Sequence, residues 1–483
     1  MTKGAFMNDK LDILYLKSGA EISEQALSDL GFDLIGNSAF CDCPGLYRSF
    51  CKVLNSPAKD REILLEKQRI YLDFCAYPFL IEKIRDYCNR AADFYLNPFG
   101  KNFRTVNDRL KYYLSNTLEL IDIYDKFPGV FRGLRFKSRT LGEYRQEPCL
   151  MLKKELERLT SLYTSSSFSL NIEFNDGFKL KSASLNDAEN VKILPAYSSN
   201  KKKKNAEVLP FSEDRIFFGN NNVVYNVANE LKNSMMLNLC ANISSINSSI
   251  KDFFVHLMAE VEFYDAALNL KNYMAEKNLP FCMPEIVDTN MVIRAKELYD
   301  LGLASLLDEP VTANDISMEN GKILIVTGHN RGGKTTFLKS VGIAQILAQS
   351  GLFVPAKEYS CPAYSGILTH FPSGEDETLS DGKLAEELKR LKKDFHMLKG
   401  GGLALFNESF STTTAKEGAE IGIDVLRAVN SSGSHAVFVT HLMELAKNRE
   451  RIGDAVSLTT ENADSYKIAE GEPVADIRAY EML

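Results

Sequence analysis

The chain has 483 residues and a formal net charge of −7, with 45% hydrophobic and 25% charged residues. This length predicts two to four domains, and the composition is that of an ordinary globular protein. The acidic balance excludes a polycation, so any contact with nucleic acid must come from a local basic patch.

Three further features predict a cytoplasmic protein with no membrane segment. No apolar run approaches the roughly 18 residues that a membrane span needs. The N-terminal stretch MTKGAFMNDKLDIL lacks the apolar core of a signal peptide. The nine cysteines have no zinc-like spacing, so we expect them to be reduced thiols.

The N-terminal part is predicted to be mainly helical. Residues 1–40 carry only a weak alternating run, LDILYLK, and stay unassigned. The pattern is helical from 56 to about 96, with Pro78 as a break. Apolar residues recur at spacings of three and four over 107–123, which predicts an amphipathic helix, and a further helix is expected over 141–163.

The hydrophobic period changes in SFSLNIEFNDGFKLKSASL, residues 167–185. Apolar residues alternate on both sides of a turn at 175–177, which predicts a β-hairpin. A polar tract, SSNKKKKN, follows. Its lysines are Lys201, Lys202, Lys203 and Lys204. A solvated loop tip is one interpretation of this run, and a contact with nucleic-acid phosphates is the other.

Residues 220–279 contain neither glycine nor proline. As one helix they would span on the order of 90 Å at about 1.5 Å per residue. The stretch ANISSINSSI keeps isoleucines at helical spacing, so the helix either continues or bends there. The N-terminal part is therefore expected to consist of long helices, with a small β insertion between an outgoing and a returning arm.

After about residue 287, short apolar strands alternate with helices, which is typical of a parallel α/β domain. The stretch ILIVTGHNRGGKTTFLKS combines a buried strand, a loop matching G-x-x-x-x-G-K-[ST] and a helix, the context that a P-loop requires. The motif predicts a site for ATP, with Lys334 at the β- and γ-phosphates and Thr335 on Mg²⁺. The residues assigned to the nucleotide are Gly328, Asn330, Gly332, Gly333, Lys334, Thr335 and Thr336.

Two more buried strands end in polar residues. The run 403–406 ends in Asn407 and Glu408, and HAVFV is followed by Thr440 and His441. Because open α/β sheets bind ligands at the carboxyl ends of their strands, we expect these side chains at the nucleotide.

Between the P-loop and the run 403–406, the stretch 379–383, LSDGK, resembles the L-S-G-G-Q signature of ABC-type ATPases and precedes a helix as that signature does. In those enzymes the loop contacts the γ-phosphate that the opposite subunit holds. The resemblance implies a homodimer in which Ser380 and Gly382 complete the partner's site.

The chain resembles the MutS family of DNA mismatch repair ATPases. The similar stretches are VTANDI, TGHNRGGKTTFLKSVGIAQILAQSGLFVPA, NESFSTTTAKEG and FVTHLMELA, in that order. The resemblance implies an ATP-dependent DNA-binding protein of repair or recombination, whose partners are duplex, mismatched or branched DNA. It also implies that Glu408 polarises the attacking water, that His441 contacts the γ-phosphate and that Asn407 holds a Mg²⁺-bound water.

The same resemblance implies a domain organisation and a fold class. Residues 1–40 stay unassigned, 41–290 would form a mainly α-helical core and lever with a small β clamp insertion at about 165–215, and 291–483 would form the α/β P-loop ATPase domain of ABC type. On this basis the lysines at 201–204 would lie at the clamp tip.

Three features depart from the family pattern. Asn407 stands where the family has aspartate, the signature loop reads LSDGKL rather than G-x-[ST]-T-F, and about 40 N-terminal residues leave no room for a mismatch-binding domain. Loss of one carboxylate predicts weaker Mg²⁺ binding at a working site. Two alternatives stay open: an ABC-type ATPase of another assembly, and a nucleotide-gated scaffold that does not hydrolyse ATP.

Overall fold

The computed structural model describes residues 19–93, 169–175, 179–186, 257–288, 292–318, 322–372, 382–461 and 465–475, with a few isolated positions between 108 and 255. These residues belong to two compact units. The first comprises Met1–Met7, Asp86–Lys126 and Lys137–Val255, and the second comprises Asn8–Arg85, Phe127–Phe136 and His256–Leu483.

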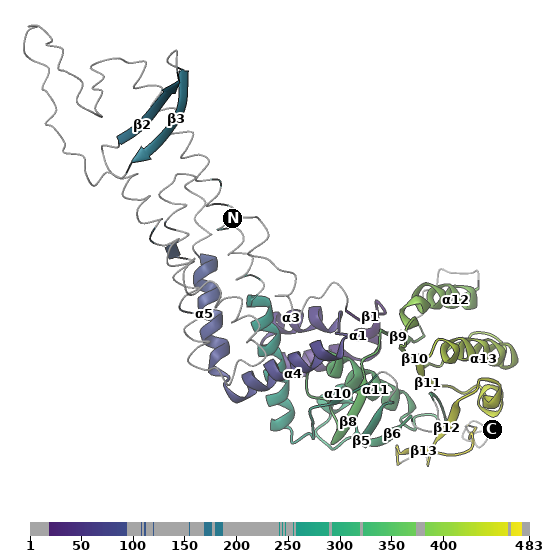
Figure 1. The fold of residues 1–483 in the computed structure, drawn as a ribbon. Helices are drawn as coiled ribbons and strands as arrows, with labels where there is room; N and C mark the ends of the chain where they lie inside the picture. Colours follow the sequence, from purple (N-terminus) through teal and green to yellow (C-terminus); the bar gives the residue numbers. More distant parts are fainter. Residues whose placement is uncertain are drawn as a thin grey trace, which may run out of the picture. The chain divides into compact units, whose positions relative to one another are not determined.

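The first unit contains the predicted hairpin (Figure 1). Strand β2 (Ser169–Asn175) pairs antiparallel with β3 (Lys179–Asn186), and the register shifts between Glu173 and Phe174. The pairing confirms the β-hairpin that the alternating apolar residues predicted. The helices predicted at 107–123 and 141–163 lie almost wholly outside the described residues, and the lysine run at 201–204 lies entirely outside them.

In the second unit, a short strand at 21–22 is followed by helices. They are α1 (Ala26–Asp29), α2 (Phe32–Ala39), α3 (Pro44–Leu54), α4 (Arg61–Ala76) and α5 (Phe79–Asp93), the last of which continues into the first unit. Asp60 caps the N-terminus of α4, and its side chain accepts hydrogen bonds from two backbone N–H groups of the first turn. The gap between α4 and α5 contains Pro78, which confirms the predicted break.

The returning helical segment is described from 257 to 276. It packs against the preceding helices through aromatic and polar contacts. The Tyr71 hydroxyl donates to the Ala267 carbonyl at 2.9 Å, the rings of Phe50 and Phe263 stack with centroids 5.9 Å apart, and Arg85 pairs with Asp265. These contacts join α3, α4 and the start of α5 to the segment at 257–276.

A seven-stranded sheet with the order β1-β9-β10-β11-β7-β12-β13 forms the centre of this unit. All neighbours are parallel except β12 and β13. The strands are β1 (Glu21–Ile22), β7 (Ile323–Thr327), β9 (Gly366–His370), β10 (Leu403–Asn407), β11 (His435–Val439), β12 (Ala455–Thr460) and β13 (Ile468–Glu470). The predicted parallel α/β architecture is confirmed for this part of the chain.

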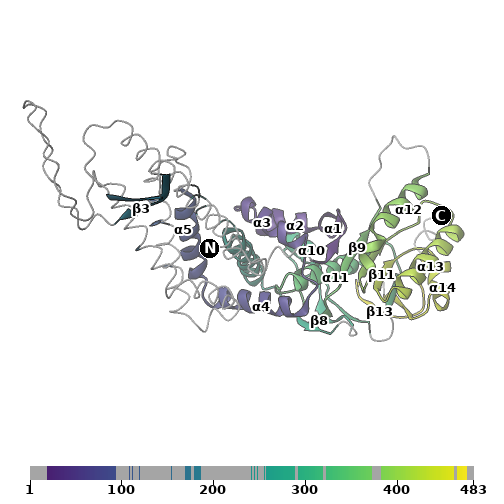
Figure 2. The same cartoon turned by 45° about the horizontal axis from the view of Figure 1, so that its top comes forward.

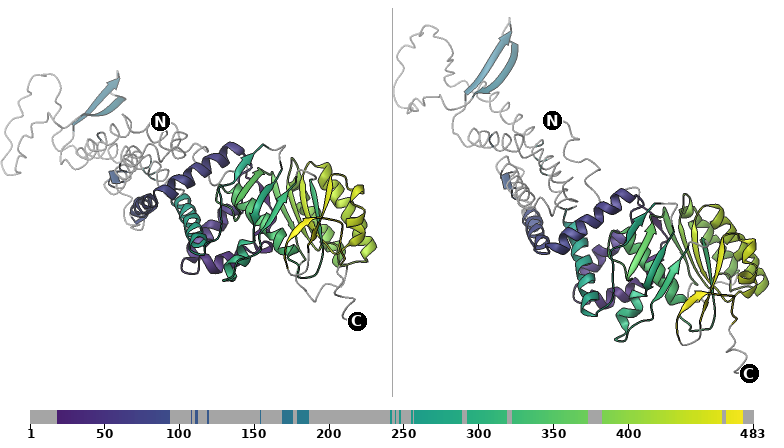
Figure 3. Two further views of the ribbon diagram at one scale, coloured as in Figure 1. Left: turned by 90° about the horizontal axis from the view of Figure 1, so that it is seen from below. Right: turned by 60° about the horizontal axis from the view of Figure 1, so that its bottom comes forward.

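Helices cover both faces of this sheet (Figures 2 and 3). Phe406 and Phe438 face a core that includes Leu391, Ile423 and Leu445. These three residues lie on α12 (Lys383–Asp394), α13 (Ala415–Ser431) and α14 (Met443–Lys447). Leu405, the alternate residue of β10, faces Gly342 of α11 (Lys334–Gln349). Two 3₁₀ turns, Phe395–Leu398 and Arg449–Arg451, complete this part.

A second, mixed sheet has the order β4-β8-β5-β6. Its strands are β4 (Glu285–Val287), β8 (Glu358–Pro362), β5 (Arg294–Leu298) and β6 (Asn314–Ser317), and α10 (Leu301–Leu306) follows β5. No helix within the described ranges is long and apolar enough to cross a lipid bilayer.

Residues that the sequence left unassigned contribute to the large sheet. Strand β1 pairs parallel with β9, with Glu21 opposite Gly366. The Ser23 and Thr369 hydroxyls lie 2.8 Å apart, and the Thr369 hydroxyl donates to Asp29 at 2.6 Å. An edge strand from 21–22 was not expected. The boundaries at 40 and 290 stay predictions.

Candidate nucleotide site

The loop between β7 and α11 has the backbone that a phosphate cradle needs. Gly328, Arg331 and Gly333 all have positive φ, at 126°, 60° and 85°. A side chain at Gly328 or Gly332 would collide with Thr460 of β12, so glycine is required at both positions. The loop leads into the N-terminus of α11, where backbone N–H groups and the helix dipole favour an anion.

Lys334, the first residue of α11, is buried against this loop. Its ammonium donates to the carbonyl oxygens of Gly328 at 3.1 Å and His329 at 2.9 Å. The next residue, Thr335, donates its hydroxyl proton to Asn407 Oδ1 at 3.0 Å. The end of β10 thus meets the start of α11, across 72 positions of sequence.

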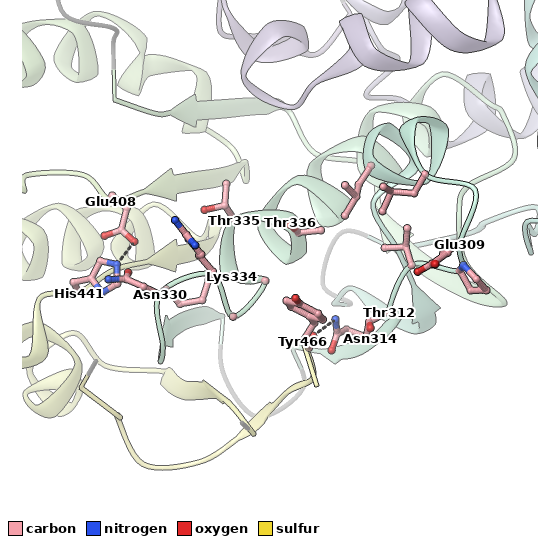
Figure 4. Close-up of a pocket in the computed structure, with 17 residues that line it drawn as sticks. Glu309, Thr312, Asn314, Asn330, Lys334, Thr335, Thr336, Glu408, His441 and Tyr466 are labelled. Carbon is pink, nitrogen blue, oxygen red and sulfur yellow. Dashed lines mark hydrogen bonds and ion pairs between the residues drawn. The ribbon is translucent and has the colours of Figure 1, made fainter. Parts of the chain in front are cut away.

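Two further predicted residues meet beside the loop. Strands β10 and β11 are parallel neighbours with Asn407 opposite Val439, so the residues after them reach the same edge of the sheet. His441 Nε2 lies 3.0 Å from Glu408 Oε1 (Figure 4). The Glu408 side chain is 24% exposed and that of His441 is 42% exposed, so both are open to a ligand.

Lys334, Thr335, Glu408 and His441 line one cavity of about 600 Å³, whereas Asn407 lies behind Thr335 and is not among the lining residues. The sequence predicted only part of its wall. Residues from the second sheet and its flanks close the remaining side: Leu303, Leu307, Glu309, Pro310, Val311, Thr312 and Asn314, together with Tyr466 from the β12–β13 connection. The stretch VTANDI pointed to some of them, whereas Tyr466 carried no sequence signal because it stands alone in a polar loop.

Asn314 connects the two sides of this wall. Its Nδ2 donates to the Tyr466 carbonyl at 3.2 Å, and its Oδ1 accepts from the Ile468 N–H at 2.9 Å. Tyr466 has a positive φ of 52°, and its side chain lies close to Gly333 of the loop. The ring is therefore held where a flat apolar group can stack beside the phosphate cradle (Figure 4).

The residues beside Lys334 offer few ligands for a Mg²⁺ ion. Thr335 and Asn407 offer two neutral oxygen atoms beside Lys334. Among the described residues there is no cluster of three or more His, Cys, Asp or Glu side chains that could hold a metal. Because Mg²⁺ keeps several waters and uses substrate phosphates as ligands, these two neutral oxygens would hold it only together with the phosphates of a bound nucleotide.

Among the described residues, the predicted Gly328 and Gly382 do not line this cavity. Ser380 lies outside the described residues. Gly382 is exposed, has a φ of 75° and caps the start of α12. The role of both residues in a partner's site stays a prediction.

Comparison with known proteins identifies the domain that carries this cavity. Residues 324–469 match the family model of MutS domain V. The chain is 28% identical to the DNA mismatch repair protein MutS of Synechococcus sp. over 206 residues, 42% of this chain and 22% of that protein. It is 31% identical to MutS protein homolog 4 of Mus musculus over 155 residues, 32% and 16% of the two chains.

A third relative, Endonuclease MutS2 of Pediococcus pentosaceus, is 33% identical over 178 residues, 35% of this chain and 22% of that protein. The chain spans about a fifth of the length of the curated relatives it matches. The match includes the P-loop, Glu408, His441 and Tyr466, whereas the lining residues between 303 and 314 precede it. Over residues 324–469 the chain is therefore similar to domain V of the MutS family.

Proposed function

We propose that the chain is a MutS-type ATPase that binds ATP with Mg²⁺, binds DNA and acts in mismatch repair or recombination. One observation carries the proposal: the side chains of Lys334 and Thr335, at the start of α11, and of Glu408 and His441, after β10 and β11, line a single cavity. The family match covers the same residues.

In the proposed binding step, phosphate oxygens replace the two loop carbonyls as acceptors for the Lys334 ammonium. A phosphate carries full negative charge where a carbonyl carries only a partial one, so the exchange favours the nucleotide. The backbone N–H groups of the glycine loop and the N-terminus of α11 add further donors. The apolar wall with Tyr466 is suited to the base.

In the proposed chemical step, Glu408 accepts a hydrogen bond from the attacking water, and His441 donates to the γ-phosphate. Their 3.0 Å contact places both groups at one point of the cavity edge. When bound, Mg²⁺ would neutralise developing charge on the phosphates. Asn407 orients the Thr335 hydroxyl and offers an oxygen ligand, but it lacks the charge of an aspartate.

The proposed partners are DNA and a second copy of the chain. The names of two relatives refer to DNA mismatch repair and to an endonuclease. We expect a cytoplasmic homodimer in which Ser380 and Gly382 contact the other subunit's nucleotide. ATP turnover would then change the conformation of a DNA clamp formed by residues 165–215, with Lys201–Lys204 at the phosphates.

An ATPase assay on the purified chain tests the proposal. ATP hydrolysis is measured without DNA and with duplex, mismatched and branched DNA, beside the Lys334→Ala variant. The proposal expects Lys334-dependent hydrolysis that responds to DNA. Hydrolysis with no response to any DNA favours an ATPase of another assembly, and absence of ATP binding overturns the proposal.

A second candidate, a nucleotide-gated scaffold, rests on Asn407. It expects ATP binding without hydrolysis at any Mg²⁺ concentration, whereas the ATPase proposal expects hydrolysis to rise with Mg²⁺. Titrating Mg²⁺ in the same assay separates the two.

A further inference from the structure

The turn that carries Glu408 has a strained backbone. Glu408 and Phe410 have positive φ values of 49° and 63°, although neither is glycine. Side chains other than glycine adopt this conformation only where surrounding contacts enforce it. The contacts that enforce it therefore determine where the Glu408 carboxylate points.

A single carboxylate, Glu387, holds the turn from α12. The Phe410 N–H donates to Glu387 Oε1 at 2.8 Å, and the Thr412 hydroxyl donates to Oε2 at 3.3 Å. Both oxygens are thus occupied by the segment directly after Glu408. On the opposite side, the Glu408 N–H donates to the Val439 carbonyl at 2.9 Å, which extends the ladder to β11.

The residue between the two strained positions is held by His370 at the end of β9. The Ser409 hydroxyl donates to the His370 carbonyl at 3.1 Å, and Ser409 Oγ lies 2.7 Å from His370 Nδ1. Because the Ser409 hydroxyl donates its one proton to the His370 carbonyl, its oxygen can only accept from the ring. His370 Nδ1 therefore carries a proton and donates to Ser409 Oγ. Burial, followed by the positive charge of Arg390, lowers the pKa of His370 to about 4, so the ring is neutral.

This tautomer also agrees with the surroundings of the ring. Nδ1 lies 3.8 Å from Glu387 Oε1, which favours the proton on that nitrogen. Nε2 is buried and has no hydrogen-bond partner in the part of the chain that the structure describes. A bare nitrogen at that position costs less than an unpartnered N–H would.

We propose that Glu387 is a positioning residue for Glu408: its carboxylate fixes the turn so that Glu408 faces the cavity, and it makes that orientation depend on α12. This inference rests on the proposed role of Glu408 in ATP hydrolysis. Helix α12 begins after Gly382, at the end of the loop that we expect to enter a partner's site. Glu387 lies five residues beyond, about 7.5 Å along the helix axis.

The consequence is a direct connection between the two halves of a composite site. A displacement of α12 on dimerisation would move the acceptor of the Phe410 N–H. The turn would then relax or tighten, and the Glu408 carboxylate would leave or reach its working position.

Two variants of Glu387 and one control test this. Glu387→Ala removes both acceptors, whereas Glu387→Gln keeps an oxygen for the Phe410 N–H. Glu386→Ala is the matched control, because Glu386 lies on the same helix and is exposed. We expect Glu387→Ala to lower kcat roughly tenfold or more, because a small misplacement of a reacting group is costly. The Kd for ATP should stay within about twofold, Glu387→Gln should recover much of kcat and Glu386→Ala should match wild type.

Hydrogen exchange of the peptide that covers residues 404–414 gives a second readout. Exchange should be faster in Glu387→Ala than in Glu387→Gln or Glu386→Ala. Wild-type kcat in Glu387→Ala overturns the inference alone, and so does a parallel loss of ATP binding and kcat, which indicates a structural role. A wild-type protein that does not hydrolyse ATP overturns the proposed function and this inference with it.

Discussion

The phosphate loop and the turn after β10 reach positive φ values largely by different means. The loop uses glycine at two of its three such positions, Gly328 and Gly333, where the conformation costs little, and Arg331 at the third. The turn uses Glu408 and Phe410, which require support from Glu387 and His370. A loop that binds through its backbone has no need of side chains, whereas a turn that must present a carboxylate has to keep one and is held by contacts from distant strands and helices.

The largest expected effect concerns the loop. Lys334→Ala should weaken ATP binding by roughly 100-fold or more, because it removes the charge-assisted hydrogen bonds of the one lysine that lines the cavity in the described part of the chain. Titration with a fluorescent ATP analogue measures this, with Lys416→Ala on the exposed face of α13 as control. Equal affinities in the two variants would contradict the P-loop assignment.

A substitution in the turn should change the rate of hydrolysis rather than the affinity for ATP. Glu408→Gln should lower kcat by roughly 100-fold while the Kd for ATP changes little, since positioning a water acts on the transition state. The variant should also accumulate as an ATP-bound dimer in sedimentation experiments. A turnover rate near that of wild type would refute the role of Glu408.

Asn407 joins the two regions through its contact with Thr335. Asn407→Asp should lower the Mg²⁺ concentration for half-maximal hydrolysis several-fold, because a charged ligand replaces a neutral one of nearly the same shape. The maximal rate should change less. An unmoved Mg²⁺ midpoint, or hydrolysis only in the variant, would favour the scaffold over the ATPase.

The smallest expected effect concerns the free-energy cost of a positive φ in the loop and in the turn. Gly333→Ala should destabilise the protein by about 1–2 kcal/mol, because a side chain enters a left-handed position close to Tyr466. At position 408 glycine should likewise be the better residue than alanine. The free energy of unfolding of Glu408→Gly should therefore exceed that of Glu408→Ala by about 1 kcal/mol. Urea denaturation of the three variants provides the comparison, and equal stabilities at position 408 would argue against strain there.

The sequence predicted the loop better than the turn. The glycine spacing of 328–335 is local, so strand, loop and helix could all be read from one stretch. The end of β10 was placed correctly at the sheet edge because its apolar run is short and bounded by polar residues. The same reasoning predicted the antiparallel hairpin at 169–186 from its alternation.

What the sequence did not predict depends on contacts between distant residues. Glu387 was part of an ordinary amphipathic helix, and His370 was one more polar residue after an apolar run. Tyr466 reaches the cavity only because Asn314 holds its carbonyl across 152 positions of sequence. No periodicity encodes such pairs, since they arise when separate elements pack.

The edge strand β1 also sets an order of events during synthesis. Ser23 and its partner Thr369 are 346 positions apart. At about 5–20 residues per second, a ribosome needs on the order of tens of seconds to make the intervening chain. Throughout that interval Ser23 and the β1 strand have no β9 to pair with, so β1 can join the large sheet only after a chain segment more than 300 residues away has been made.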